Sequence, residues 1–223
     1  NDGRNSYIKG SSIHHGRNLF VRVHGTNFLT VENNVGYDTT GHGYTTEDGS
    51  EVYNVFYHNL ASRTRNSVPT NPNDPTDPHK GSGFWLNNAR NYLRNNYAAD
   101  TDGWGYEIVP ITVDSPTHGA LRIGKVMPIV DINGSPLPPT SITTLPVLEF
   151  SNNRAYASFL GGAEVINIES NEENSIVGFV SHNTRSGTFI GYARYFFFDQ
   201  VNTTEVGLYY PRMHVVGLDS AGS

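Results

Sequence analysis

The densest group of carboxylic acids and imidazoles in this 223-residue chain lies within residues 35–59. Its members are Asp38, His42, Glu47, Asp48, Glu51 and His58. An acid and a base that share one face can carry out glycoside hydrolysis. We assign this role to His42 and Glu47, because adjacent strand residues point to opposite faces and Asp48 is then left to cap the turn at Gly49. The alternative is that exposed carboxylates here are ordinary solvated surface.

A second reading of the same region is a divalent metal site. The candidate ligands are His15, His24, Asp38 and His42. Imidazole and carboxylate groups suit zinc, manganese or similar ions. The spacing matches no short ligand motif, so the alternative is that each histidine is a hydrogen-bonded turn residue. We therefore predict that the four side chains cluster in neighbouring segments, and leave open whether an ion joins them.

A repeat must position these residues. An apolar residue, any residue, Asn or His, and then Asn recur in this order, ending at Asn34, Asn59, Asn96, Asn153 and Asn183 with intervals of 25, 37, 57 and 30 residues. Short alternating runs divided by Gly, Asn and Pro indicate strands and turns. A period in the twenties without helical patterns is typical of a parallel β-helix. We predict that the final Asn residues stack as a ladder, satisfying buried backbone groups.

The longer intervals indicate insertions into one all-β domain that covers residues 1–223. Residues 66–80 are rich in proline and are predicted to leave the coil as an exposed loop. Residues 110–146 form a second predicted excursion. Because the chain begins at Asn1 without a signal peptide, we expect an internal piece of a longer, secreted protein with further domains.

Alternation within the coils predicts an outward polar row. Its expected members are Arg22, Glu47, Asn87 and Glu107, with Phe20 and Trp85 beside them. Two coils separate Glu47 from Glu107, which is about 9.6 Å and near the upper end of the roughly 6.5–9.5 Å carboxyl separation of inverting glycosidases. Arg22 would contact a substrate carboxylate and Trp85 would stack on a sugar ring, while Phe20 and Asn87 would line the contact.

Composition excludes several classes. The net charge is −6, which argues against nucleic acid as a partner, since phosphate binding needs a basic surface. The chain has no cysteine, so disulfides and thiolate metal sites are excluded. No apolar run reaches the length of a membrane span.

The motifs in the first 60 residues resemble one known family. They are Ser12-Ile13-His14-His15, Val23-His24-Gly25-Thr26-Asn27, Val35-Gly36-Tyr37-Asp38, Gly41-His42 and Thr46-Glu47-Asp48-Gly49. In order, they resemble the β-helix core of the family of hyaluronan-binding and cell-surface hyaluronidase proteins, with fibrocystin-like relatives. The resemblance implies a right-handed parallel β-helix, an extracellular or cell-surface location, and binding or depolymerisation of hyaluronan or a related acidic polysaccharide.

A negatively charged chain is a poor match for a polyanion unless arginine or a metal ion lines the groove. The alternative function is therefore a non-catalytic segment, in which the β-helix is a structural or adhesive spacer in a cell-surface or filament protein. Fold alone does not choose between these functions.

Overall fold

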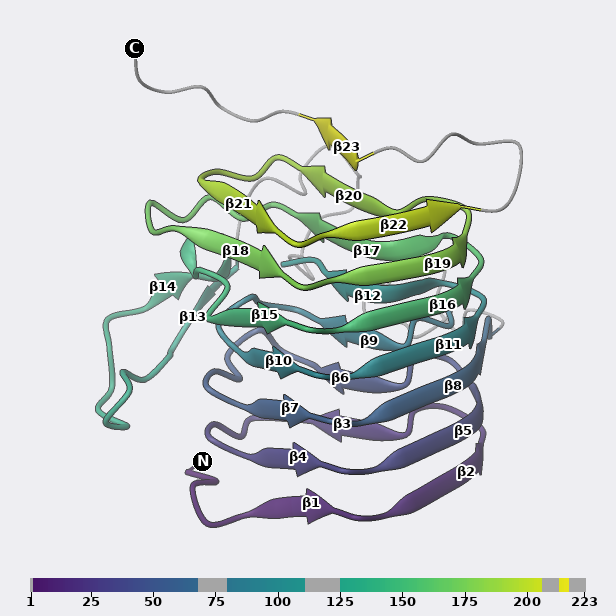
Figure 1. Ribbon diagram of the computed structural model, residues 1–223. Helices are drawn as coiled ribbons and strands as arrows, with labels where there is room; N and C mark the ends of the chain where they lie inside the picture. The colour runs from purple at the N-terminus through teal and green to yellow at the C-terminus, as the bar shows by residue number, and fades with distance from the viewer. Residues whose placement is uncertain (1, 68–79, 111–124, 206–212, 217–223) are drawn as a thin grey trace.

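A computed structural model describes residues 2–67, 80–110, 125–205 and 213–216. Three parallel sheets of seven strands each run the length of the molecule, and the chain visits them in turn (Figure 1). It crosses the front from the first sheet to the second, returns across the back through the third, and climbs one step per circuit in a right-handed sense. The predicted right-handed parallel β-helix is confirmed. Among the described residues, no helix has the length and apolar character needed to cross a membrane.

The strands of each sheet are short and follow one another at coil spacing. The first sheet contains β1 (Tyr7–Lys9), β4 (Thr30–Glu32), β7 (Val55–Tyr57), β10 (Tyr92–Arg94), β15 (Glu149–Ser151), β18 (Asn174–Val177) and β21 (Phe196–Asp199). The second contains β2 (Ser12–Gly16), β5 (Val35–Thr40), β8 (Leu60–Arg65), β11 (Tyr97–Thr101), β16 (Arg154–Ser158), β19 (Val180–Thr184) and β22 (Asn202–Glu205). The third contains β3 (Val21–Val23), β6 (Tyr44–Thr46), β9 (Phe84–Leu86), β12 (Trp104–Ile108), β17 (Gly161–Ile166), β20 (Thr188–Gly191) and β23 (Met213–Val216).

The asparagine ladder is present at the corner between the first and second sheets. The Nδ2 of Asn34 donates to Oδ1 of Asn59 at 2.9 Å, and the steps from Asn59 to Asn96 and from Asn96 to Asn153 are both 3.1 Å. All four side chains are buried. Each amide also bonds backbone groups, so the ladder satisfies polar atoms that would otherwise be buried without partners.

The residue before each ladder asparagine explains the rest of the motif. Asn33, His58, Asn95 and Asn152 all have φ between 51° and 54°. Asparagine and histidine are enriched in this left-handed region among residues other than glycine. The paired Asn or His therefore bends the chain at the corner, while the second residue forms the ladder.

The fifth predicted repeat was wrong. His182 and Asn183 lie inside β19, where His182 pairs with Tyr156. Because Val180 pairs with Arg154, the preceding Phe179 takes the ladder position of that coil, and it is fully buried. The ladder thus ends at Asn153 and an aromatic ring continues the column.

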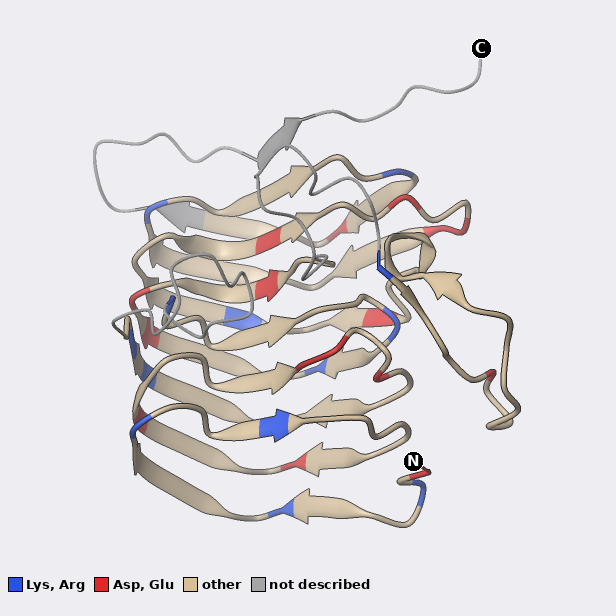
Figure 2. Ribbon diagram, turned by 180° about the vertical axis from the view of Figure 1, so that it is seen from behind, with Lys and Arg blue, Asp and Glu red and all other residues tan. Residues whose placement is uncertain are grey.

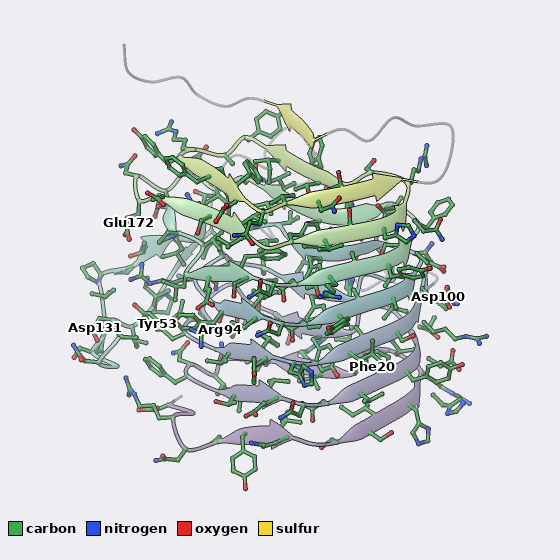
Figure 3. All side chains as sticks on the ribbon, viewed as in Figure 1. Phe20, Tyr53, Arg94, Asp100, Asp131 and Glu172 are labelled. Atoms are coloured by element: carbon green, nitrogen blue, oxygen red, sulfur yellow. The ribbon has the colours of Figure 1, made fainter. Side chains whose placement is uncertain are left out.

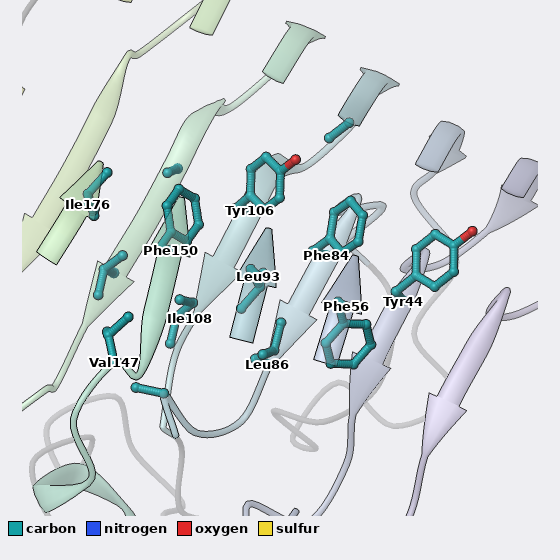
Figure 4. Packing of buried hydrophobic residues seen from close by; sticks show 14 of the residues in the cluster. Tyr44, Phe56, Phe84, Leu86, Leu93, Tyr106, Ile108, Val147, Phe150 and Ile176 are labelled. Carbon is teal, nitrogen blue, oxygen red and sulfur yellow. The ribbon is translucent and has the colours of Figure 1, made fainter. Parts of the chain in front are cut away.

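Aromatic rings stack through the core between the sheets. Tyr44, Phe84 and Tyr106 lie above one another with ring centroids 5.1 and 4.9 Å apart (Figure 4). The residue before each of these is glycine. A Cβ on Gly83 would lie 2.8 Å from both the Cβ of Ala98 and the carbonyl oxygen of Gly105, so the second and third sheets approach too closely there for any side chain.

Phe20 faces this core rather than the outside. It is 8% exposed and its ring centroid lies 6.0 Å from that of Tyr44. The prediction that Phe20 lines an outer contact surface was therefore wrong. Its ring occupies the space beneath Gly36, a position in which the facing strand has no side chain.

The two predicted insertions both enter at corners of the coil. Most of the first, residues 68–79, lies outside the described residues, as do residues 111–124 of the second. In the rest of the second, β13 (Val126–Met127) and β14 (Thr140–Ser141) form an antiparallel pair, followed by a short 3₁₀ helix, Ile142–Thr144. Ile142 packs on Val52 and Tyr53 at the side of the coils, and the connection through Asp131 projects beyond them (Figure 3).

Candidate functional site

The outer face of the third sheet carries Arg22, Trp85 and Glu107 from the predicted site. Figure 2 views this sheet from behind, with its basic and acidic residues coloured. Strand pairing places Arg22, Thr45, Trp85, Glu107 and Glu164 in one row on consecutive coils. The predicted row was wrong in two members. Glu47 and Asn87 follow the ends of β6 and β9 and lie beside that row, where Asn87 Nδ2 donates to the Glu47 carbonyl at 2.9 Å.

The error has two origins. One is the step from β9 to β12, where Glu107 pairs with Trp85 and not with Asn87. The other lies in the first coil. Val21–Val23 belongs to the coil whose ladder position is Ser11, which donates its backbone N–H to Asn34 Oδ1 at 2.9 Å. Pairing from that coil to the next is offset by 23 residues, as between Val21 and Tyr44. The interval of 25 between Asn34 and Asn59 therefore does not apply to Arg22.

Glu47 is tied to two cationic partners at the edge of the face. Its Oε1 lies 2.7 Å from Arg22 Nη1 and its Oε2 lies 2.9 Å from His24 Nδ1. The second contact carries charge only when His24 is protonated. The expected proximity of Arg22 and Glu47 is present, although they do not share a row. An acid or base role for Glu47 stays a prediction.

Trp85 and His42 are buried against each other. Their ring centroids are 5.4 Å apart with a 17° angle between planes, and each side chain is 4% exposed. Nδ1 of His42 accepts the backbone N–H of Ser82 at 3.2 Å. Trp85 points outward from the coil as predicted, but its burial leaves no open ring face for a sugar, so that platform is not available.

The four predicted metal ligands do not come together. His15 Nε2 lies 3.8 Å from Asp38 Oδ2 on the second sheet, whereas His24 and His42 lie at opposite ends of third-sheet strands. His15 and Asp38 lie within β2 and β5 of the second sheet, at left-handed positions with φ of 54° and 62°. The predicted cluster is therefore wrong.

Within the described part of the chain, one other group brings potential ligand atoms within 4.8 Å of one another: His24, Asp48 and Glu51. Glu51 is fully buried and accepts backbone N–H bonds from Gly25, Asp48 and Gly49. Burial raises the pKa of Glu51, and backbone hydrogen bonds, among them those from Gly25 and Asp48, oppose the rise. The carboxylate thus closes the turn between the third and first sheets, which is a structural role.

The sequence did not point to the most unusual pair of groups on the face. Glu107 and Glu164 are register partners on adjacent coils, so two carboxyl groups project from neighbouring positions. Glu107 is 2% exposed; it accepts the Ser82 hydroxyl at 2.6 Å and lies 3.5 Å from Lys80 Nζ. Glu164 is only partly buried and Lys80 is exposed, so solvent reaches the Glu107–Glu164 pair at these two residues.

The surroundings of this pair favour one proton on it. Burial, together with the charge of Glu107, raises the pKa of Glu164 to about 8, although Lys80 opposes both effects. The Glu107 carboxylate in turn raises the pKa of Lys80. At neutral pH Glu164 is then a neutral acid next to a carboxylate, which is the arrangement that separates acid and base roles in carboxyl-pair enzymes.

Spacing decides which carboxyl chemistry the pair fits. Adjacent coils are about 4.8 Å apart, which is close to the roughly 5–5.5 Å carboxyl separation of retaining glycosidases and short of the roughly 6.5–9.5 Å of inverting ones. The inverting geometry predicted for Glu47 and Glu107 assumed that they share one row, and they stand in different rows. The repeated pattern of Tyr106-Glu107-Ile108 and Ala163-Glu164-Val165 is the sequence signal that would have revealed Glu164.

Replacing Glu164 by Gln should change how stability depends on pH. The folded-state pKa of Glu164 is raised to about 8 from an ordinary 4.5, so the folded protein holds this proton more tightly than the unfolded chain does. The stability that this proton contributes is fully present below pH 4.5 and is lost as the pH rises to about 8. The facing groups are Glu107, Lys80 and the uncharged Phe189. In urea unfolding, the wild type and Glu164→Gln should have equal free energies of unfolding near pH 5. At pH 9 the variant should be more stable by on the order of 2 kcal/mol, a figure already reduced because solvent near Lys80 screens the charges. A constant difference across this range would contradict the raised pKa.

Comparison with known proteins gives one family match. The CEMIP beta-helix family profile matches residues 1–163. The chain is 32% identical over 178 residues to a cell surface hyaluronidase of Danio rerio, covering 70% of this chain and 12% of that protein. It is 30% identical over 182 residues to the cell migration-inducing and hyaluronan-binding protein of Mus musculus, covering 73% and 12%. It is also 37% identical over 101 residues to fibrocystin-L of Mus musculus, covering 45% and 2%. The chain therefore spans about an eighth or less of these relatives.

Proposed function

Because the chain belongs to the CEMIP β-helix family, we propose that it binds and hydrolyses an acidic polysaccharide of the hyaluronan type, in a protein at the cell surface or outside the cell. Two of its relatives are named for hyaluronan or for its hydrolysis, which supports this substrate class. The proposed location is supported by the name of one relative, a cell surface hyaluronidase.

The observation that carries the proposal is the carboxyl pair Glu107–Glu164 beside Lys80. Glu107 is 2% exposed, so the reaction requires the exposed Lys80 beside it to move aside first. In the first step the Glu164 proton then passes to the glycosidic oxygen while the Glu107 carboxylate attacks the anomeric carbon; the glycosidic bond breaks and an ester forms. In the second step Glu164 takes a proton from water, whose oxygen attacks the anomeric carbon and releases Glu107. One bond is hydrolysed, one water is consumed and both carboxyl groups return to their starting states.

Other groups on the face suit an acidic polymer. Lys80 is exposed beside Glu107, and Arg22 with His24 lies farther along the same sheet. Cations at these points offset the acidic character of a chain with net charge −6 when a uronic-acid polymer approaches. Ser82 donates to Glu107 and holds the carboxylate in place.

The test compares hyaluronan with a neutral glucan of matched length. We expect the purified protein to generate new reducing ends from hyaluronan only, and the first product to keep its anomeric configuration by proton NMR. Binding of hyaluronan without cleavage would refute the hydrolytic part. An inverted product would refute the assignment of Glu107 as the nucleophile.

A second candidate function is a structural spacer. It is favoured by the unbroken ladder from Asn34 to Asn153 and by the burial of Thr45, Trp85 and Glu107 in the middle of the row. A spacer needs stacking and no open groove. Absence of both binding and cleavage in the same experiment would favour it over the polysaccharide-active module.

A further inference from the structure

The outer side of the first and second sheets exposes one tyrosine on each of four consecutive coils. These are Tyr37 on β5, Tyr57 on β7, Tyr97 on β11 and Tyr156 on β16, which are 42%, 38%, 40% and 54% exposed. We call this surface the tyrosine face. It is the broad front of the molecule in Figure 1, and the catalytic proposal places nothing on it.

Cations and imidazoles accompany the rings. The Arg154 guanidinium lies 5.6 Å from the Tyr97 ring centroid, and Arg63 Nη1 lies 3.4 Å from the Tyr37 hydroxyl. The His182 ring centroid lies 5.3 Å from that of Tyr156. The His58 ring centroid lies 6.0 Å from that of Tyr57. Each of the four rings therefore has a basic or titratable group beside it.

The charges of this surface differ from those of the chain as a whole. Arg154 contacts a ring and, within the described residues, has no ion pair with a carboxylate. Asp38 is engaged by Arg63 at 3.1 Å, and Asp100, at the outer edge of β11 (Figure 3), pairs with Arg65. The acids at this edge thus have cationic partners, while Arg154 remains able to bind an added anion.

We infer that the tyrosine face is a second polysaccharide-binding surface, on which a uronic-acid polymer lies along the coil axis away from Glu107 and Glu164. Ring faces of tyrosine pack against the apolar faces of sugars, and arginine binds carboxylates in a bidentate manner. Tyr37 and Tyr156 share one row of the second sheet, three coils or about 14 Å apart, and Tyr97 lies in a neighbouring row on the coil before Tyr156. The rings therefore follow the coil axis, the direction in which a linear polymer would lie. The acidic nature of the polymer rests on the proposed function.

The experiment measures affinity for hyaluronan of defined length by calorimetry, in Glu164→Gln protein so that the polymer stays intact. In that background, Tyr97→Ala combined with Arg154→Ala should weaken binding by at least about tenfold and lower its salt dependence. Tyr195→Ala is the matched control: Tyr195 is 50% exposed but precedes β21 at another corner, so affinity should not change.

The outcomes separate the two proposals. If the background protein binds hyaluronan and the double variant binds as tightly, the tyrosine face is refuted while the proposed function stands. If the background protein binds no hyaluronan, the proposed function fails. Equal affinity for a neutral glucan would refute the role of Arg154, and partial recovery of affinity by Arg154→Lys would support it over a folding defect.

Discussion

Glu164→Gln should lower the rate of hyaluronan cleavage by about a thousandfold, the size expected when a positioned general acid is lost. The amide keeps the shape of the carboxyl group but has no proton to transfer to the leaving oxygen. Binding of the intact polymer should persist, because the contacts assigned to binding lie elsewhere. Initial rates of reducing-end formation at pH 6.5 and affinity for the same polymer measure the two effects.

Two comparison variants make this prediction specific. Glu173→Gln removes an exposed carboxylate at the corner after β17 and should leave the rate unchanged. Glu47→Gln tests the acid predicted from the sequence, whose carboxylate is held by Arg22. If Glu47→Gln abolished cleavage and Glu164→Gln did not, the catalytic assignment would move to the other row. In the wild type, cleavage should also decline above about pH 8, as Glu164 loses its proton.

Asn96→Ala should lower the free energy of unfolding by about 3–5 kcal/mol, the size expected when a buried hydrogen-bond network is broken. Its Oδ1 accepts from the backbone and side-chain nitrogens of Asn59, and its Nδ2 donates to the Phe56 carbonyl and to Asn153 Oδ1. Alanine supplies none of these four bonds, and water cannot replace them at a fully buried position. Urea unfolding with a linear fit measures the loss.

Asn95→Gly is the neighbouring control for the ladder. Asn95 has φ 52°, a region that glycine adopts without steric cost, and the ladder bonds described here belong to Asn96. Its effect should stay within about 1 kcal/mol. Similar losses for the two variants would show that the corner bend, rather than the amide column, dominates stability here.

The ladder and the fold could be predicted because their signal is local. Two adjacent residues, one suited to a left-handed bend and one to an amide column, recur in the sequence at Asn33-Asn34 and again at Asn95-Asn96. The register of the third sheet failed first where this signal is missing, because the first coil carries Ser11 in place of asparagine, and again between β9 and β12, where Glu107 pairs with Trp85 and not with Asn87. The repeats were aligned on their asparagines, and the coil that contains Arg22 has none at the ladder position. Its offset of 23 residues to the next coil could therefore not be detected.

The site was harder to predict because burial depends on residues distant in the sequence. Strand alternation correctly turned Trp85 and Glu107 outward, but it carries no information about whether an outward side chain meets solvent. Glu164 was missed for another reason. It lies 57 residues after Glu107 in the chain, yet becomes its neighbour once the excursion of residues 110–146 is set aside.

The two insertions, residues 66–80 and 110–146, both lie at corners between sheets. The strands of the second sheet on either side of them keep their register with the preceding coil. This makes the coil a unit of growth. Duplicating about 25 residues from one ladder asparagine to the next should lengthen the protein by a single step of about 4.8 Å, with new edges identical to the old ones. Deleting one residue within a strand would instead invert every side chain after it in that strand. A designer could thus extend the tyrosine face by whole coils, and set the length of polymer that it holds.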